Sequence, residues 1–149
     1  MNDFVVFYAW QSDRPAEITR ALIREALETA ASAITNDASV STRVLIDSDT
    51  QCVLGHVPVI DTIIEKIHAT DAFVPDLTFV AATDDGKHIP NTNVLLEYSY
   101  ALAVIPVMNI EYGLPENLPF DFGYRRHPLT FKLSPTATAP QRLTATKKL

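Results

Sequence analysis

The sequence has few glycines and a single cysteine, and each shortage excludes a class of protein. The 149 residues contain four glycines, none of which is placed to form a glycine-rich phosphate loop, so the dinucleotide fingerprint and the Walker motif are both absent. Cys52 has no second cysteine with which to form an internal disulfide, and no clustered ligands indicate a metal site. We therefore expect neither a hydride-transfer enzyme nor a P-loop ATPase, and no metal or other cofactor.

Long apolar runs and an excess of basic residues are also missing. No segment reaches the roughly 18 consecutive apolar residues of a membrane helix, and the first residues do not have the pattern of a signal peptide. Lys and Arg number 12 against 18 Asp and Glu, which gives a net charge of −6. Binding to a phosphate backbone needs clustered basic residues, so nucleic acid is not the expected partner. We expect one cytoplasmic domain over residues 1–149 that binds neither nucleic acid nor membrane.

Apolar segments with strand-like and helix-like spacing alternate along the chain. Short apolar runs predict five strands, at residues 4–8, 40–46, 71–75, 105–110 and 129–133. Helical spacing predicts helices over 15–34, from 58, from 94 and from 139. Asn93 is the predicted N-cap of the third helix, and 77–89 is a predicted loop. This alternation predicts an α/β fold with a parallel sheet covered by helices on both faces.

The link between the third helix and the fourth strand contains no turn residues. A connection from helix to strand usually needs two or more loop residues. Either the helix ends early, near Ala101, or the link at Ala103–Ile105 has been shortened.

Polar and aromatic residues follow the predicted strands, where an open parallel sheet binds its ligands. The candidates at this edge are Tyr8, Trp10 and Ser12 after the first strand, Asp47 and Asp49 after the second, and Asp76 after the third. For Tyr8 and Trp10 the alternative is core packing, and for Asp47 and Asp76 it is turn formation at the end of a strand.

Glu97 lies beside the apolar stripe of the third helix, which holds Val94, Tyr98 and Ala101. A carboxylate there requires an explanation, because burying an unpaired charge costs several kcal/mol or raises its pKa. Glu97 is either a structural residue that pairs with a neighbour or a catalytic carboxylate at the mouth of a pocket. Asn93, at the start of the same helix, is a candidate for substrate binding.

The candidate residues favour chemistry at an anomeric carbon. Breaking a glycosidic bond builds positive charge on a ribose ring, which a nearby carboxylate stabilises or captures. Aromatic rings such as those of Tyr8 and Trp10 can stack on a planar base. A pyrophosphate could bind the amino end of the first helix, near Ser12 and Arg14, although Asp13 could instead simply cap that helix.

Several segments together resemble a bacterial TIR-like family. The segments are Phe7–Asp13, Asp47–Pro58, Asp71–Leu77, Pro90–Leu102 and Leu118–Asp121. Members of this family are NAD-cleaving effectors of antiphage defence, often fused to a module that senses a cyclic nucleotide. One departure is Tyr98-Ser99-Tyr100, where the family usually has Leu-Gly-Tyr.

The resemblance implies a flavodoxin-like three-layer fold with a five-stranded, mostly parallel sheet in the order 2-1-3-4-5. It implies that Glu97 is the catalytic glutamate, that NAD is the substrate, and that the loop Asp47–Pro58 closes over it and joins neighbouring subunits. Activity would require self-association into filaments or other oligomers. Lys147–Leu149 resembles the middle of a C-terminal helix, so residues 1–149 are expected to belong to a longer protein with a sensor domain.

Three other functions stay open at this point. One is an N-glycosidase similar to nucleoside deoxyribosyltransferases, which also use a glutamate on a helix. Another is a non-catalytic TIR scaffold that signals by assembly alone. The third, binding of a cyclic-nucleotide signal in the pocket, is disfavoured by the scarcity of basic residues.

Overall fold

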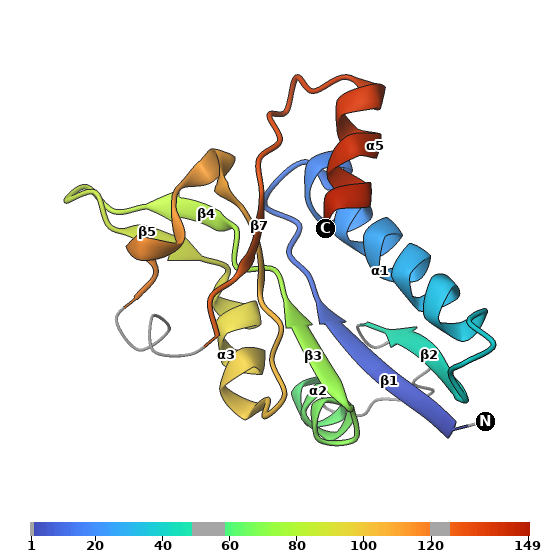
Figure 1. Cartoon of the computed structure of the whole chain (residues 1–149). Coiled ribbons are helices and arrows are strands. Elements are labelled where there is room, and N and C mark those ends of the chain that lie inside the picture. Colours follow the sequence, from blue (N-terminus) through green and yellow to red (C-terminus); the bar gives the residue numbers. More distant parts are fainter. Residues whose placement is uncertain (1, 49–58, 120–125) are drawn as a thin grey trace.

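A parallel three-stranded sheet lies at the centre of the fold (Figure 1). The computed structural model describes residues 2–48, 59–119 and 126–149. The strands β1 (Asn2–Ala9), β2 (Thr42–Asp47) and β3 (Ala72–Pro75) pair in the order β2-β1-β3. β2 lies at one end of this sheet.

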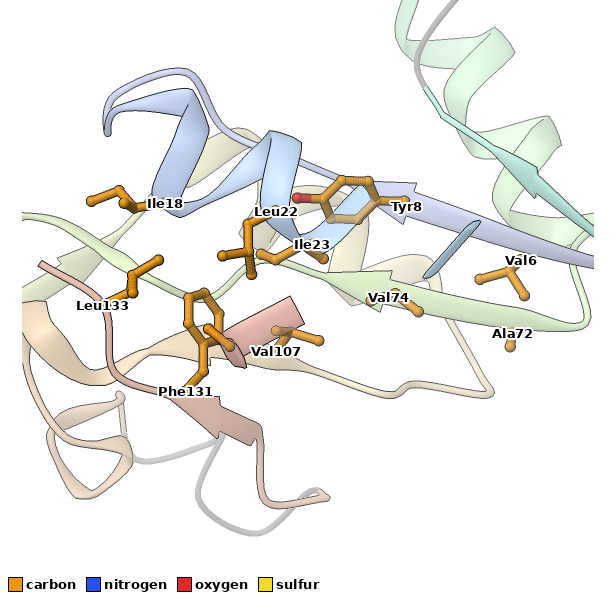
Figure 2. Close-up of a cluster of buried hydrophobic side chains, with 11 residues drawn as sticks. Val6, Tyr8, Ile18, Leu22, Ile23, Ala72, Val74, Val107, Phe131 and Leu133 are labelled. Carbon is orange, nitrogen blue, oxygen red and sulfur yellow. The ribbon is translucent and has the colours of Figure 1, made fainter. Parts of the chain in front are cut away.

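Helices cover both faces of the sheet, and alternate side chains of β1 point to opposite faces. Val6 and Tyr8 pack in one core cluster with side chains of α1 (Arg20–Thr35) and α5 (Ala139–Lys148) (Figure 2). Phe7 and Ala9 pack in a second cluster with α2 (Val59–His68) and α3 (Thr92–Tyr100). Each large apolar side chain buried in this way contributes about 1.5–3 kcal/mol. The predicted α/β class, with a parallel sheet and helices on both faces, is confirmed.

Two further strands form a separate parallel pair, β6 (Val107–Asn109) and β7 (Leu129–Phe131). Isolated parallel bridges join Phe73 to Val104 and Asp76 to Val107. The Leu77 amide donates to the Val107 carbonyl at 2.8 Å. The segment that leads into β6 therefore runs beside β3, but the described strands do not form one continuous ladder. The five-strand order 2-1-3-4-5 stays a prediction.

The predicted loop over 77–89 is wrong, because most of it is an antiparallel hairpin of β4 (Phe79–Ala82) and β5 (His88–Pro90). The Gly86 amide donates to the Thr83 carbonyl at 2.9 Å and closes the turn, and Gly86 has φ 83°, which suits glycine. The Phe79 ring stacks on His88 at 4.7 Å between ring centres. Short 3-10 helices follow β6 at η2 (Ile110–Tyr112) and η3 (Pro115–Asn117).

The first helix is interrupted, where a continuous helix was predicted. A 3-10 turn, η1 (Ala16–Ile18), precedes α1, and Thr19 between them has φ −137° and ψ −102°. The Thr19 hydroxyl donates to the Pro15 carbonyl at 2.8 Å, which closes this turn apart from the helix. α3 ends at Tyr100 with Ala101 as its C-cap, so the early end near Ala101 is confirmed.

An apolar hollow of about 490 Å³ lies between α1 and the sheet. Its walls come from α1, from the strands and from the chain end, and they include Ile23, Leu27, Ala30, Val44, Val74, Ile105 and Leu149. None of the helices in the described ranges is long and apolar enough to cross a membrane.

Candidate active site

A cleft of about 290 Å³ opens at the carboxyl end of β1. Its lining comes from β1 and the loop that follows, from α2 and from α3: Phe7, Tyr8, Ala9, Trp10, Gln11, Ser12, Ile63, Asn91, Asn93 and Glu97. Five residues predicted from the sequence are therefore brought to one site, namely Tyr8, Trp10, Ser12, Asn93 and Glu97. Gln11 and Asn91 also line it and were not predicted as site residues.

Glu97 lies one helical turn after Asn93, so both side chains are on the same face of α3. The Glu97 side chain is half-buried and borders the cleft, and it interacts with another group. The catalytic interpretation needs a carboxylate that is partly shielded from water and still open to a pocket. The position of Glu97 meets both conditions.

The start of α3 is fixed by Asn91, and the predicted cap Asn93 is wrong. The Asn91 side-chain oxygen accepts from the backbone amides of Asn93 at 2.9 Å and Val94 at 3.1 Å. Its amide nitrogen donates to Asp13 Oδ2 at 2.7 Å. Asp13 therefore contacts α3 from the loop after β1, and the two walls of the cleft are joined. Pro90-Asn91 is a recognisable turn signal, but the cap lies two residues earlier than the apolar stripe indicates.

Gln11 organises the loop after β1 from a buried position, with 2% of its surface exposed. Its oxygen accepts from the backbone amides of Asp13 at 2.6 Å and Arg14 at 3.0 Å. Its nitrogen donates to Asp76 Oδ2 at 3.3 Å. A glutamine in a polar loop gives no sequence signal of burial, so nothing in the sequence indicated this role.

Asp76, predicted to bind substrate, is fully buried behind the cleft and does not line it. The Thr78 amide donates to Asp76 Oδ1 at 3.0 Å. Burial raises the pKa of this carboxyl, and the hydrogen bonds from Thr78 and Gln11 oppose the shift. The observed contacts give Asp76 a structural role at the end of β3.

Two other predicted residues have partners away from the cleft. Asp47 is paired with Lys66 of α2 at 3.0 Å. Arg14 donates through Nε to the Phe79 carbonyl at 2.9 Å, and its guanidinium carbon lies 4.0 Å from the centre of the Tyr112 ring. Neither residue is part of the lining. Asp49 and most of the predicted loop 47–58 lie outside the described residues.

The two aromatic candidates differ in exposure. Tyr8 is fully buried in the core cluster that it shares with α1 (Figure 2), as the core-packing alternative predicts. It also borders the cleft. Trp10 is partly buried, and the guanidinium carbon of Arg20 lies 5.0 Å from the centre of the Trp10 ring. Within the described residues, no group of three His, Cys, Asp or Glu side chains could hold a metal ion.

Comparisons with known proteins do not assign this chain to a family. No family model matches the sequence, and no curated protein matches it. One solved structure that the chain is similar to is a 2-desoxiribosyltransferase from Leishmania mexicana, at 17% identity and a TM-score of 0.43. The match covers 71% of this chain and 65% of that chain, less than two thirds of its length. A likeness this weak carries no argument about fold or function, and the resemblance to the TIR-like family stays a prediction.

Proposed function

We propose that this protein is an enzyme that cleaves an N-glycosidic bond at a ribosyl carbon, with Glu97 as the catalytic carboxylate. The observation that carries the proposal is the position of Glu97 in a cleft that it shares with Tyr8 and Trp10 at the carboxyl end of a parallel strand. This is the edge at which open α/β sheets bind ligands.

The chemistry follows from these groups. The bond between ribose C1 and the base nitrogen breaks, its electron pair leaves with the base, and positive charge develops on the ribose ring. The Glu97 carboxylate stabilises that charge or adds to C1. Water then attacks C1, displaces Glu97 where it has bonded, and gives up a proton to the departing base or to solvent. Trp10 offers an aromatic face to the planar leaving group. This role requires the ionised form of Glu97 before the reaction.

The finer proposal is an NAD glycohydrolase, and its support is the sequence resemblance to TIR-like effectors. The cleft of about 290 Å³ is at the lower limit of ligand pockets, which span roughly 300–1,000 Å³. It would hold the nicotinamide riboside part of NAD, while the rest of the dinucleotide extends outside. The same size favours a nucleoside as the alternative substrate, so a nucleoside N-glycosidase is the second candidate.

The resemblance also supports a biological setting, which we include in the proposal. The enzyme would act in the cytoplasm as an effector of antiphage defence, active after self-association into filaments or oligomers. A cyclic-nucleotide sensor domain, in the same or an associated chain, would drive that assembly. Specific activity that rises with protein concentration would support this part, and specific activity that stays constant would contradict it.

The central experiment compares substrates and one substitution. The protein is incubated at high concentration with NAD and with purine and pyrimidine nucleosides, and the products are identified by mass spectrometry. We expect release of a free base, and we expect Glu97→Gln to lower its rate about 10²–10⁴-fold while the circular dichroism spectrum and melting temperature are retained.

Glu65→Gln is the matched control, because Glu65 is an exposed glutamate of the neighbouring helix α2 and does not line the cleft. It should keep the activity of the unmodified protein. Full base release by the folded Glu97→Gln variant would contradict the proposed function.

A further inference from the structure

A second hollow, of about 400 Å³, adjoins the cleft on the side of α1. It is lined by Tyr8, Trp10, Arg20, Ala21 and Arg24. Tyr8 and Trp10 line both the cleft and this hollow, so the two share a wall. The two hollows are therefore neighbours, with Tyr8 and Trp10 between them.

Two guanidinium groups give the hollow its charge. Arg20 and Arg24 are four residues apart on α1 and so face the same side. Arg20 lies over the Trp10 ring, and Arg24 donates to the Ser48 hydroxyl. Arg24 also approaches Glu28 at 3.8 Å, but the Glu28 side chain is 58% exposed and therefore offsets little of the positive charge.

The Tyr8 hydroxyl is buried at this hollow without a hydrogen-bond partner in residues 2–48, 59–119 and 126–149. An unpaired buried hydroxyl is unfavourable, and such a group in a native protein requires an explanation. Burial raises the pKa of Tyr8 well above its ordinary value, Asp76 raises it further, and Arg24 and Arg20 oppose the shift. The hydroxyl is therefore protonated at neutral pH and can donate to a ligand.

The amino end of α1 adds to the positive potential. α1 has 16 residues, its first turn contains no acidic residue, and the Thr19 side chain does not cap it. The backbone amides at a helix amino end favour an anion.

We propose that this hollow is the phosphate subsite of the active site, where Tyr8 donates a hydrogen bond and Arg20 and Arg24 supply the charge. The inference rests on the proposed function and deepens it, because it makes the substrate a 5′-phosphorylated ribosyl compound. The 5′-phosphate and the glycosidic bond belong to the same ribose, which matches two hollows with a common wall. Arg14, which the sequence placed near the phosphates, is held by Phe79 and Tyr112 instead.

The test uses two substrates that differ only in the 5′-phosphate, nicotinamide mononucleotide and nicotinamide riboside. We expect the unmodified protein to prefer the mononucleotide at least tenfold in kcat/KM. The double variant Arg20→Gln/Arg24→Gln should lose that preference through a higher KM and cleave the riboside within twofold of the normal rate. Arg43→Gln is the matched control, because Arg43 is exposed, pairs with Asp3 and does not line the hollow.

A binding measurement separates this inference from the proposed function. Inorganic pyrophosphate is titrated by calorimetry into the unmodified protein, the double arginine variant, Tyr8→Phe and Glu97→Gln. We expect at least tenfold weaker binding for the double variant, severalfold weaker binding for Tyr8→Phe, and unchanged binding for Glu97→Gln. Tyr8→Phe keeps the ring that packs beneath α1, so a purely structural tyrosine would leave binding unaltered.

Pyrophosphate binding that is equal in all variants, or an equal loss of activity on both substrates, would overturn the phosphate subsite. Riboside cleavage that depends on Glu97 would then still support the proposed function. The opposite result is pyrophosphate binding that depends on the two arginines, with no cleavage of any N-glycoside. The hollow would then be an anion site, but not a subsite for the substrate of a glycosidase.

Discussion

Asp76 is a carboxylate with no exposure to solvent, held by hydrogen bonds from Gln11 and Thr78 at the end of β3. Burial favours its neutral form, so its pKa is raised in the folded protein. In the unfolded chain the same group titrates near 3.9. The folded state therefore holds the proton more tightly than the unfolded state does.

This difference predicts how Asp76→Asn changes stability with pH. The contribution of Asp76 to the free energy of unfolding is fully present below its ordinary pKa and is lost as the pH rises through the raised pKa. Asn does not titrate, so the stability of the variant relative to the unmodified protein should increase from about pH 4 to about pH 8, by about 1.4 kcal/mol for each unit of the shift. Urea unfolding of both proteins at the two pH values measures this change in relative stability.

Asp37→Asn is the control of opposite sign. Hydrogen bonds from the Ser39 hydroxyl and amide lower the pKa of the exposed Asp37 carboxyl. Its stabilising contribution is present above the ordinary pKa and is lost as the pH falls through the lowered one, so the stability of this variant relative to the unmodified protein should rise as the pH is lowered below about 4. If the difference in free energy of unfolding between Asp76→Asn and the unmodified protein did not change with pH, burial would not be raising the pKa of Asp76.

At the scale of elements, the start of α3 sets the orientation of Glu97, and one asparagine holds it. Asn91→Ala removes the acceptor of two backbone amides and should lower the free energy of unfolding by about 0.5–2 kcal/mol. Asn93 takes part in the cap through its backbone amide, so Asn93→Ala should change stability by no more than about 0.5 kcal/mol. Urea unfolding at neutral pH compares the two. A larger loss for Asn93→Ala would place the cap where the sequence predicted it.

The sequence predicted the elements whose apolar pattern is strong and missed those held by individual polar contacts. The buried strands β1 and β3 and the start of α5 agree with their predictions to within two residues. The hairpin over 79–90 was predicted as a loop, because its strands are short and Asp85-Gly86 was read only as part of a loop.

The sequence likewise predicted some residues of the candidate site and missed others. Glu97 was found because a carboxylate beside an apolar stripe is unusual. Gln11 could not be found, since its burial depends on a partner 65 positions away. Arg20 and Arg24 were missed because basic residues on a helix usually face solvent. Their place in the hollow depends on the path of the chain after β1.

At the scale of the whole molecule, the hollow between α1 and the sheet exposes aliphatic surface that most folded domains cover. The native protein should therefore bind the dye 1-anilinonaphthalene-8-sulfonate and enhance its fluorescence. Ala30→Glu places a carboxylate in the lining and should reduce the signal severalfold. Ala33→Glu, on an exposed residue of the same helix outside the lining, should not. Equal fluorescence in both variants would show that the dye binds elsewhere.

The position of Trp10 gives the molecule a built-in optical reporter. Trp10 is the single tryptophan of the chain, so all indole emission comes from the wall between the two hollows. Its emission also reports the polarity of its surroundings and the nearby guanidinium of Arg20. Occupation of either hollow can thus be followed on the unlabelled protein, and the order in which two ligands arrive can be resolved in a stopped-flow experiment.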